Sequence, residues 1–252
     1  MASKNSSPGS LSASTLFNVD NMVALVTGGG TGIGLMITKA LVENGASKVY
    51  IAGRRKEVLD SAVSSIGSNV IPIQCDVTSK ESLAQAVETI EKDSGYLNLL
   101  VCNSGIGGPQ VKLPTPDTTA EEWAKANLEV SFDDYVQTFS VNTAAVWFTS
   151  MACLKLLDLG NKKGNLDQSS QVIITSSIAS FNKKAPGGWA YGQSKAGPRW
   201  RPNSSPWRCP SGISEQIASH QAYFRAKCRS PSSTSTRMAQ VARALYPRRW
   251  CL

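Results

Sequence analysis

The chain has 252 residues and a formal net charge of +8, a length that suits one α/β domain with a single large core. It has no run of 18 apolar residues, and its first fourteen residues include six serines but no apolar signal core, which argues against a membrane-spanning or secreted protein. We therefore expect a soluble cytoplasmic protein without a membrane partner.

The positive charge is concentrated at one end. Residues 198–252 hold ten Lys or Arg and a single acid, Glu215, so the first 197 residues together carry a charge of about −1. The same residues contain no repeated pattern of basic and aromatic side chains, and we expect no nucleic-acid partner.

The six cysteines are scattered and form no Cys-x-x-Cys pair. Cys75, Cys102 and Cys153 lie in or beside apolar segments, which favours reduced thiols in the core over disulfides or zinc ligands. We expect no metal site.

Residues 1–18 are polar, Ser-rich and aperiodic, and they predict a disordered leader. From residue 19 onward, short apolar runs alternate with segments of helical spacing. The expected strands are Val23–Val26, Lys48–Ala52, Val70–Gln74, Leu97–Val101 and Gln171–Ile174. The expected helices are Ile33–Val42, Glu57–Ser65, Lys80–Lys92 and Asp133–Leu157. This alternation predicts an α/β fold of the Rossmann type, a doubly wound parallel sheet in a single domain over residues 19–197, incomplete at its C-terminal side.

Residues 107–122 contain three prolines and predict a loop that forms part of a rim over the active site. Tyr191 is expected near the start of another helix. After Gly197 the periodic pattern stops.

A glycine-rich turn, Thr27-Gly-Gly-Gly-Thr-Gly-Ile-Gly34, follows the first expected strand and precedes a helix. Such a turn lets backbone N–H groups and a helix N-terminus approach the pyrophosphate of a dinucleotide, although a purely structural turn is the alternative. The expected contact residues are Gly28, Thr31, Gly32, Ile33 and Gly34.

The second expected strand ends at Gly53-Arg54-Arg55. An enzyme that prefers NAD usually places an acid here to bind the ribose 2′-hydroxyl, whereas Arg54 and Arg55 favour the 2′-phosphate of NADP(H). NAD(H) is the less favoured cofactor, and two solvated arginines at a helix entrance are the alternative reading.

Polar residues also follow the third and fourth expected strands. Asp76, followed by Val77, could accept a hydrogen bond from the adenine amino group or could cap the next helix. The turn from Asn103 to Gly105 offers backbone groups where the adenine-side ribose would pass.

Tyr191 and Lys195 are four residues apart, so on a helix they share one face. An ammonium group there favours the ionised form of the phenol, which suits the phenol to proton transfer. Ser177 lies 14 residues before Tyr191.

Taken in order, these motifs resemble those of the short-chain dehydrogenase/reductase family over residues 20–197. The resemblance rests on the glycine turn, Cys75-Asp76-Val77, Asn103-Ser-Gly105, Ser140-Val-Asn142, Thr175-Ser-Ser177 and Tyr191-x-x-x-Lys195. The family more often has Asn-Asn-Ala-Gly where this chain has Asn103-Ser-Gly105, a mild change that should leave the turn intact.

The resemblance implies a role for each of four residues. Tyr191 would be the proton donor in carbonyl reduction, and Lys195 would bind the nicotinamide ribose and promote ionisation of the phenol. Ser177 would hydrogen-bond the substrate oxygen, and Asn142 would hold a water behind Lys195. It also implies a small-molecule carbonyl or alcohol substrate and a homo-oligomeric assembly, which the altered C-terminal part puts in doubt.

Residues 198–252 depart from the family. They hold half of the chain's prolines and no aspartate, where the family continues with a sixth strand and a Pro-Gly turn. Permitted codons for Trp207 to Cys228, read two nucleotides later, allow AVPQWDIRAN(S/C)I(A/S)PGLFPSEM, which resembles those missing elements. We interpret residues 198–252 as an irregular basic tail produced by a frameshift, with a genuine truncated variant as the alternative.

The sequence thus predicts an NADP(H)-dependent oxidoreductase. The alternative function is a catalytically dead, nucleotide-binding or truncated protein, against which Ser177, Tyr191 and Lys195 argue.

Overall fold

A computed structural model describes residues 18–182 and 188–199 of the chain. The expected leader therefore lies almost entirely outside the described residues, as does the tail beyond Arg199. The loop at 183–187 also falls outside them.

A parallel sheet of five strands forms the centre of the described part, in the order β3-β2-β1-β4-β5. The strands are β1 (Val23–Thr27), β2 (Lys48–Gly53), β3 (Val70–Gln74), β4 (Leu99–Cys102) and β5 (Gln171–Ile174). Because β1 pairs with both β2 and β4, the strand order reverses beside it, and ligands of open α/β sheets bind at such a reversal. The predicted Rossmann-type sheet is confirmed.

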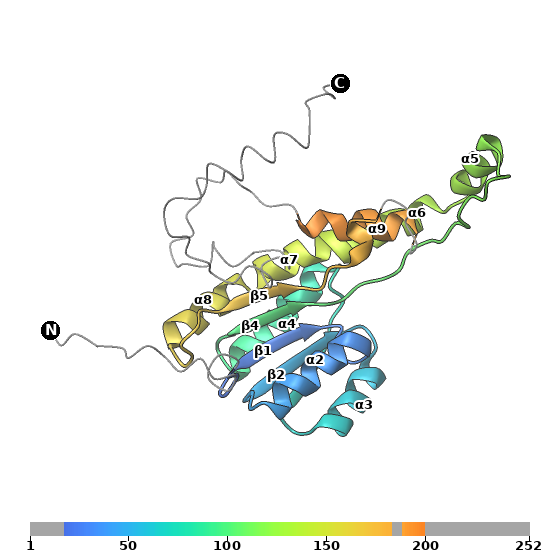
Figure 1. Cartoon of the computed structure of the whole chain (residues 1–252). Coiled ribbons are helices and arrows are strands. Elements are labelled where there is room, and N and C mark those ends of the chain that lie inside the picture. Colours follow the sequence, from blue (N-terminus) through green and yellow to red (C-terminus); the bar gives the residue numbers. More distant parts are fainter. Residues whose placement is uncertain (1–17, 183–187, 200–252) are drawn as a thin grey trace, which may run out of the picture. The chain divides into compact units, whose positions relative to one another are not determined.

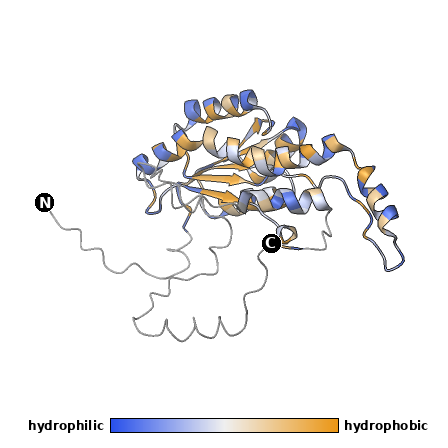
Figure 2. Cartoon of the chain, turned by 90° about the horizontal axis from the view of Figure 1, so that it is seen from above, coloured by the Kyte–Doolittle hydropathy of each residue, from blue (hydrophilic) through white to orange (hydrophobic). Residues whose placement is uncertain are grey.

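Helices cover both faces of this sheet (Figure 1). One face packs against α2 (Gly32–Glu43) and α3 (Lys56–Ile66), with Leu41 and Leu59 in its core. The other packs against α4 (Lys80–Asp93), α7 (Ala145–Ala152) and α8 (Leu154–Lys163). Figure 2 shows the strands as apolar ribbons between helices that carry hydrophilic residues. Burial on both faces explains why the strands read as apolar runs rather than alternating patterns.

The three cysteines expected in the core are buried free thiols. Burial raises the pKa of Cys102 and of Cys153 to about 12, so both stay protonated at neutral pH. They therefore act as small apolar side chains in the same core cluster.

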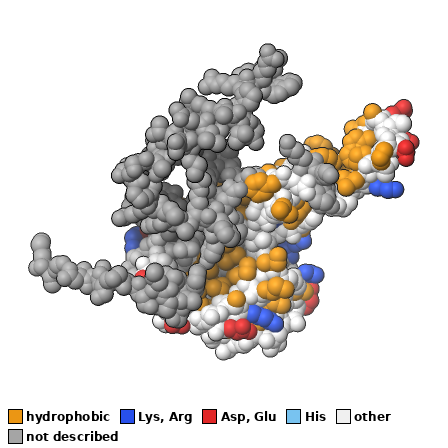
Figure 3. Space-filling model, in the orientation of Figure 1, with side chains coloured by type: hydrophobic (Ala, Val, Ile, Leu, Met, Phe, Trp, Pro, Cys, Tyr) orange, Lys and Arg blue, Asp and Glu red, His pale blue; other side chains and the backbone are white. Residues whose placement is uncertain are grey.

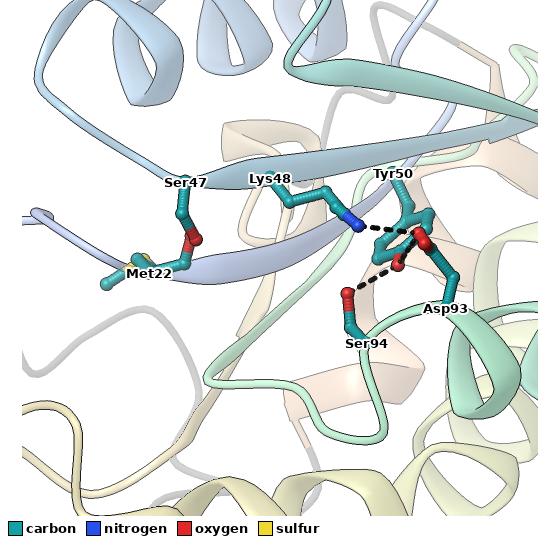
Figure 4. Close-up of polar contacts among 6 residues, drawn as sticks. All are labelled: Met22, Ser47, Lys48, Tyr50, Asp93 and Ser94. Atoms are coloured by element: carbon teal, nitrogen blue, oxygen red, sulfur yellow. Dashed lines mark hydrogen bonds and ion pairs between the residues drawn. The ribbon is translucent and has the colours of Figure 1, made fainter.

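A polar cluster fixes the C-terminal end of α4 to β2 (Figure 4). The hydroxyl of Tyr50 donates to Asp93 Oδ2 at 2.5 Å and lies 2.6 Å from Ser94 Oγ, while Lys48 Nζ donates to the same carboxylate oxygen at 2.9 Å. Burial, followed by the hydrogen bond to the Asp93 carboxylate, raises the pKa of Tyr50, so the phenol stays a neutral donor. This cluster lies where β2 begins, at the opposite end of the strand from Arg54.

The expected long helical stretch Asp133–Leu157 is confirmed as helical at every residue except Cys153, but it is not one regular α-helix. The structure divides that stretch into α6 (Phe132–Phe139), a π-helical turn η1 (Ser140–Ala144), α7 and α8, with the last two meeting at Cys153. An inserted π turn leaves the apolar spacing of the sequence nearly unchanged, which is why the periodicity suggested one helix.

The expected loop over residues 107–122 is wrong at its end, because α5 (Ala120–Leu128) begins inside it. None of the residues of α5 is buried, and Leu128 and Phe132 are 84% and 80% exposed. Figure 3 shows apolar side chains along this segment. Local capping rather than packing therefore defines α5, through reciprocal hydrogen bonds between Thr119 and Glu122.

Candidate active site

The glycine turn lies between β1 and α2, as predicted, and its backbone requires glycine. Gly28 and Gly32 have φ angles of +67° and +53°, which residues other than glycine rarely adopt. A Cβ atom on Gly34 would lie 2.1 Å from the carbonyl oxygen of Gly28. The backbone of the turn thus packs directly against the backbone at the start of α2, with no room for a side chain between them. Thr31 is the N-cap residue of α2, and Ile33 is 59% exposed.

We expect Gly34→Ala to destabilise the protein by about 1 to 3 kcal/mol, because the added methyl group must push backbone away from backbone. Urea unfolding would measure the loss. Gly107→Ala is the matched control, because a Cβ atom at that position meets nothing within 4 Å. Equal stabilities of the two variants would contradict the close approach.

A second turn, after β4, is joined to the glycine turn through Thr27. The backbone N–H groups of Asn103 and Ser104 donate to Thr27 Oγ1 at 2.9 and 3.1 Å. The side-chain amide of Asn103 donates to the carbonyl oxygen of Thr27 at 3.1 Å. The two turns therefore form one rigid unit at the carboxyl ends of β1 and β4. Sequence reasoning gave Thr27 no role, because its contacts lie more than 70 residues away along the chain.

A cleft of about 240 Å³ opens at this end of the sheet. It is lined by both turns and by residues at the ends of β2 and β3. Of the residues expected to bind the cofactor, those that line it are Gly28, Thr31, Arg54, Arg55, Asp76, Val77, Asn103 and Gly105. The structure thus brings together residues from four separate strand ends.

Asp76 lies in this cleft as a carboxylate with a local hydrogen-bond network. Its Oδ1 accepts from the hydroxyl and the backbone N–H of Thr78 at 2.7 and 2.9 Å. These hydrogen bonds, followed by the charge of Arg54, lower the pKa of Asp76 below its usual value. Asp76 is therefore an ionised acceptor at the cleft wall. It also shapes the turn before α4, but the N-cap residue of that helix is Ser79, so the capping alternative is wrong and the contact with adenine stays a prediction.

Asn142 is fully buried at the middle of η1. Its side-chain amide donates to the carbonyl oxygen of Ile106 and to Ser194 Oγ, both at 2.9 Å, and its Oδ1 accepts from the N–H of Ile106 at 2.9 Å. The side chain thus ties the loop after β4 to the helix α9 (Trp189–Ala196). π turns often occur at functional sites because they redirect one side chain.

Lys195 lies on α9, is only 5% exposed, and donates from Nζ to the carbonyl oxygen of Thr175 at 2.9 Å. Burial lowers the pKa of this amine. A Cβ atom on Gly105 would lie 3.2 Å from Lys195 Nζ and 3.1 Å from Asn142 Oδ1, so Gly105 lies next to both side chains. Because Gly105 lines the cleft, Lys195 lies beside the cleft at the end that Gly105 forms.

Ser177 and Tyr191 lie on neighbouring elements. Ser177 follows β5 and caps the short helix η2 (Ile178–Ser180), where its Oγ accepts from the N–H of Ala179 at 3.1 Å. Tyr191 is half-buried in the first turn of α9. The two elements pack closely, since a Cβ atom on Gly192 would lie 3.1 Å from the carbonyl oxygen of Ala179. Tyr191 and Lys195 share α9, as their spacing predicted.

No helix among the residues that the structure describes is long and apolar enough to span a membrane. Nor does this part of the chain hold a cluster of three or more His, Cys, Asp or Glu that could bind a metal ion.

Comparison with known proteins identifies the family of the chain. The family described as short chain dehydrogenase matches residues 22–199. The chain belongs to this short-chain dehydrogenase/reductase family.

Within the family, the chain is 52% identical over 189 residues to the short-chain dehydrogenase/reductase PhomF of Diaporthe leptostromiformis, covering 74% of this chain and 64% of PhomF. It is 42% identical over 113 residues to an NADP-dependent (R)-specific alcohol dehydrogenase of Lentilactobacillus kefiri, covering 44% of this chain and 43% of that enzyme. A short-chain dehydrogenase/reductase structure from Mycobacterium marinum shares its fold, with a TM-score of 0.59, 24% identity, and coverage of 74% of this chain and 66% of the other. The match thus spans less than two thirds of the length of PhomF.

Proposed function

We propose that this oxidoreductase uses NADP(H) to reduce a small-molecule ketone or to oxidise the corresponding alcohol, with Ser177, Tyr191, Lys195 and Asn142 as the proton-relay residues. The observation that carries the proposal is the cleft itself. It extends from Arg54 and Arg55 at the end of β2, past the glycine turn, to Gly105 beside Lys195 and Asn142.

The residues of the cleft suit a dinucleotide phosphate. Bare backbone at Gly28 and the N-terminus of α2 favour a pyrophosphate, because N–H groups there can approach an anion. Arg54 and Arg55 supply positive charge where an NAD enzyme would place an acid. When bound, the nicotinamide cofactor supplies or accepts a hydride.

The chain's own residues handle the proton. Tyr191 donates its phenolic proton to the oxygen of the substrate, and Ser177 donates a hydrogen bond to the same oxygen. Lys195 holds a positive charge beside the site at low solvent exposure, which favours the phenolate that remains. Asn142 fixes the loop at Ile106 and holds a water behind Lys195.

The substrate class is a ketone or β-ketoacyl compound in this proposal. The substrate class is supported by the family and by the name of the Lentilactobacillus kefiri enzyme, which is an alcohol dehydrogenase. The same name states NADP dependence, which supports the choice of cofactor. Binding of NADPH followed by fluorescence, and carbonyl-dependent loss of NADPH absorbance, test the proposal. Saturable NADPH binding without turnover on any ketone tested would favour the binding-only alternative.

These assays require a second protein, defined as the frame-restored chain. It keeps residues 1–197 and continues with the codons of the alternative frame. The nucleotide sequence around codon 197 fixes its composition and tests the frameshift hypothesis directly.

We expect Arg54→Asp to shift cofactor preference toward NAD(H). The difference between the binding free energies of NADP(H) and NAD(H) should change by about 1 to 3 kcal/mol. The guanidinium can pair with a 2′-phosphate, whereas the carboxylate repels it and accepts from a 2′-hydroxyl. Lys56→Glu is the matched control, because Lys56 pairs with Asp60 on the surface at 2.7 Å and the change alters net charge equally. Equal affinities of the unmodified protein for NADP(H) and NAD(H) would argue against the role of Arg54.

A further inference from the structure

Ser194, between Tyr191 and Lys195 on α9, has no solvent exposure. Its hydroxyl accepts a hydrogen bond from Asn142 Nδ2 and donates one to the carbonyl oxygen of Tyr191, both at 2.9 Å. One side chain therefore joins the π turn to the backbone of α9, at the residue expected to donate the proton.

The backbone of Ser194 is held by the same π turn. Its carbonyl oxygen accepts from Thr143 Oγ1 at 2.7 Å. Two consecutive residues of η1, Asn142 and Thr143, therefore hold Ser194 at its side chain and at its carbonyl.

These contacts extend across the whole site. Asn142 bonds both backbone groups of Ile106, which follows Gly105 in the loop after β4. The hydrogen-bond chain therefore runs from that loop through Asn142 and Ser194 to Tyr191. Rotation of α9 about its axis would break this chain and would also move Lys195 away from the carbonyl oxygen of Thr175.

We propose that Ser194 is a positioning residue that fixes the rotation of α9 against η1 and so aims Tyr191 and Lys195 into the site. The aim matters only if these two residues act as proposed above, so the inference rests on the proposed function. Ser194 need not touch substrate or cofactor; it acts through Tyr191 and Lys195.

The test compares Ser194→Ala with Ser150→Ala in the full 252-residue chain. Ser150 is the matched control, because its buried hydroxyl on α7 donates to the carbonyl oxygen of Val146 at 2.7 Å. Both variants lose one buried hydroxyl, so both should melt a few degrees lower, roughly 2–4 °C. Melting temperature alone therefore cannot separate the two roles.

The deciding readout is the pH profile of acetic anhydride labelling at Lys195, followed by mass spectrometry of its peptide. In Ser194→Ala the midpoint should rise toward the ordinary lysine value, because water reaches the amine when α9 turns. In Ser150→Ala it should stay unchanged. Thr143→Val, which removes the second contact while keeping the side-chain shape, should shift the midpoint in the same direction and serves if Ser194→Ala does not fold.

Unchanged midpoints in Ser194→Ala and Thr143→Val, with lower melting temperatures, would make Ser194 an ordinary buried hydroxyl and overturn the proposal. NADPH titration of the frame-restored chain, with and without Ser194→Ala, separates the two hypotheses. A shifted midpoint together with no NADPH binding by the frame-restored chain would keep the positioning role of Ser194 and count against the proposed function. A chain that binds NADPH should lose about tenfold in affinity in Ser194→Ala, through the displaced lysine.

Discussion

Tyr191→Phe in the frame-restored chain is expected to lower the turnover number about 10²- to 10⁴-fold, the usual contribution of a general acid. The dissociation constant of NADPH should change little, because only the transferable proton is removed and the ring keeps its place in α9. Steady-state rates of NADPH oxidation and fluorescence titration measure the two quantities separately.

Two further variants make this result specific. Tyr135→Phe is the matched control, because its hydroxyl on α6 donates to the side chain of Gln193, so a phenol is lost at another surface of α9. Its turnover should stay within a few-fold of the unmodified protein. Lys195→Met should impair both turnover and NADPH affinity, since the lysine is also expected to touch the ribose. Near-normal turnover in Tyr191→Phe would show that another group donates the proton.

Most of the fold was accessible from the sequence because its strands are buried on both faces and therefore read as apolar runs. One helix that was missed, α5, has no buried residue, so burial imposes no apolar period on it. A local signal was nevertheless present, since Thr119 and Glu122 have the spacing of a capping box. The prolines before it drew the prediction toward a loop instead.

The candidate site was only partly accessible. The positive φ angle at Gly28 and the four-residue spacing of Tyr191 and Lys195 are local properties, so both can be predicted from the sequence. The roles of Thr27 and Ser194 depend on contacts with residues far away along the chain, such as Asn103 and Asn142. Serine and threonine are also common on protein surfaces, so the residue type alone does not mark Thr27 or Ser194 as part of the site. Only the packing of the two turns, and of η1 against α9, shows their roles.

The largest expected effect on stability comes from the reading frame. In the described part of the chain β5 pairs with β4 on one side only, and Ile178, just beyond β5, is 82% exposed. The alternative-frame string resembles the family's sixth strand followed by Pro-Gly, and such a strand would pair beside β5 and cover this edge. The tail of the 252-residue chain instead has half of its prolines and ten basic residues, which are poorly suited to a buried strand.

We therefore expect the frame-restored chain to melt higher than the 252-residue chain by on the order of 10 °C, which at 2–4 °C per kcal/mol corresponds to a few kcal/mol. NADPH should raise the melting temperature of the restored chain further, because a ligand that binds only the folded state stabilises it. In the 252-residue chain cofactor stabilisation should be weak, with carbonyl-dependent NADPH oxidation near background. Parallel melting curves with and without NADPH, together with rates on a panel of ketones, measure each difference. Comparable melting, stabilisation and turnover in the two proteins would mean that residues 198–252 are a working part of the enzyme, and the frameshift hypothesis would then be abandoned.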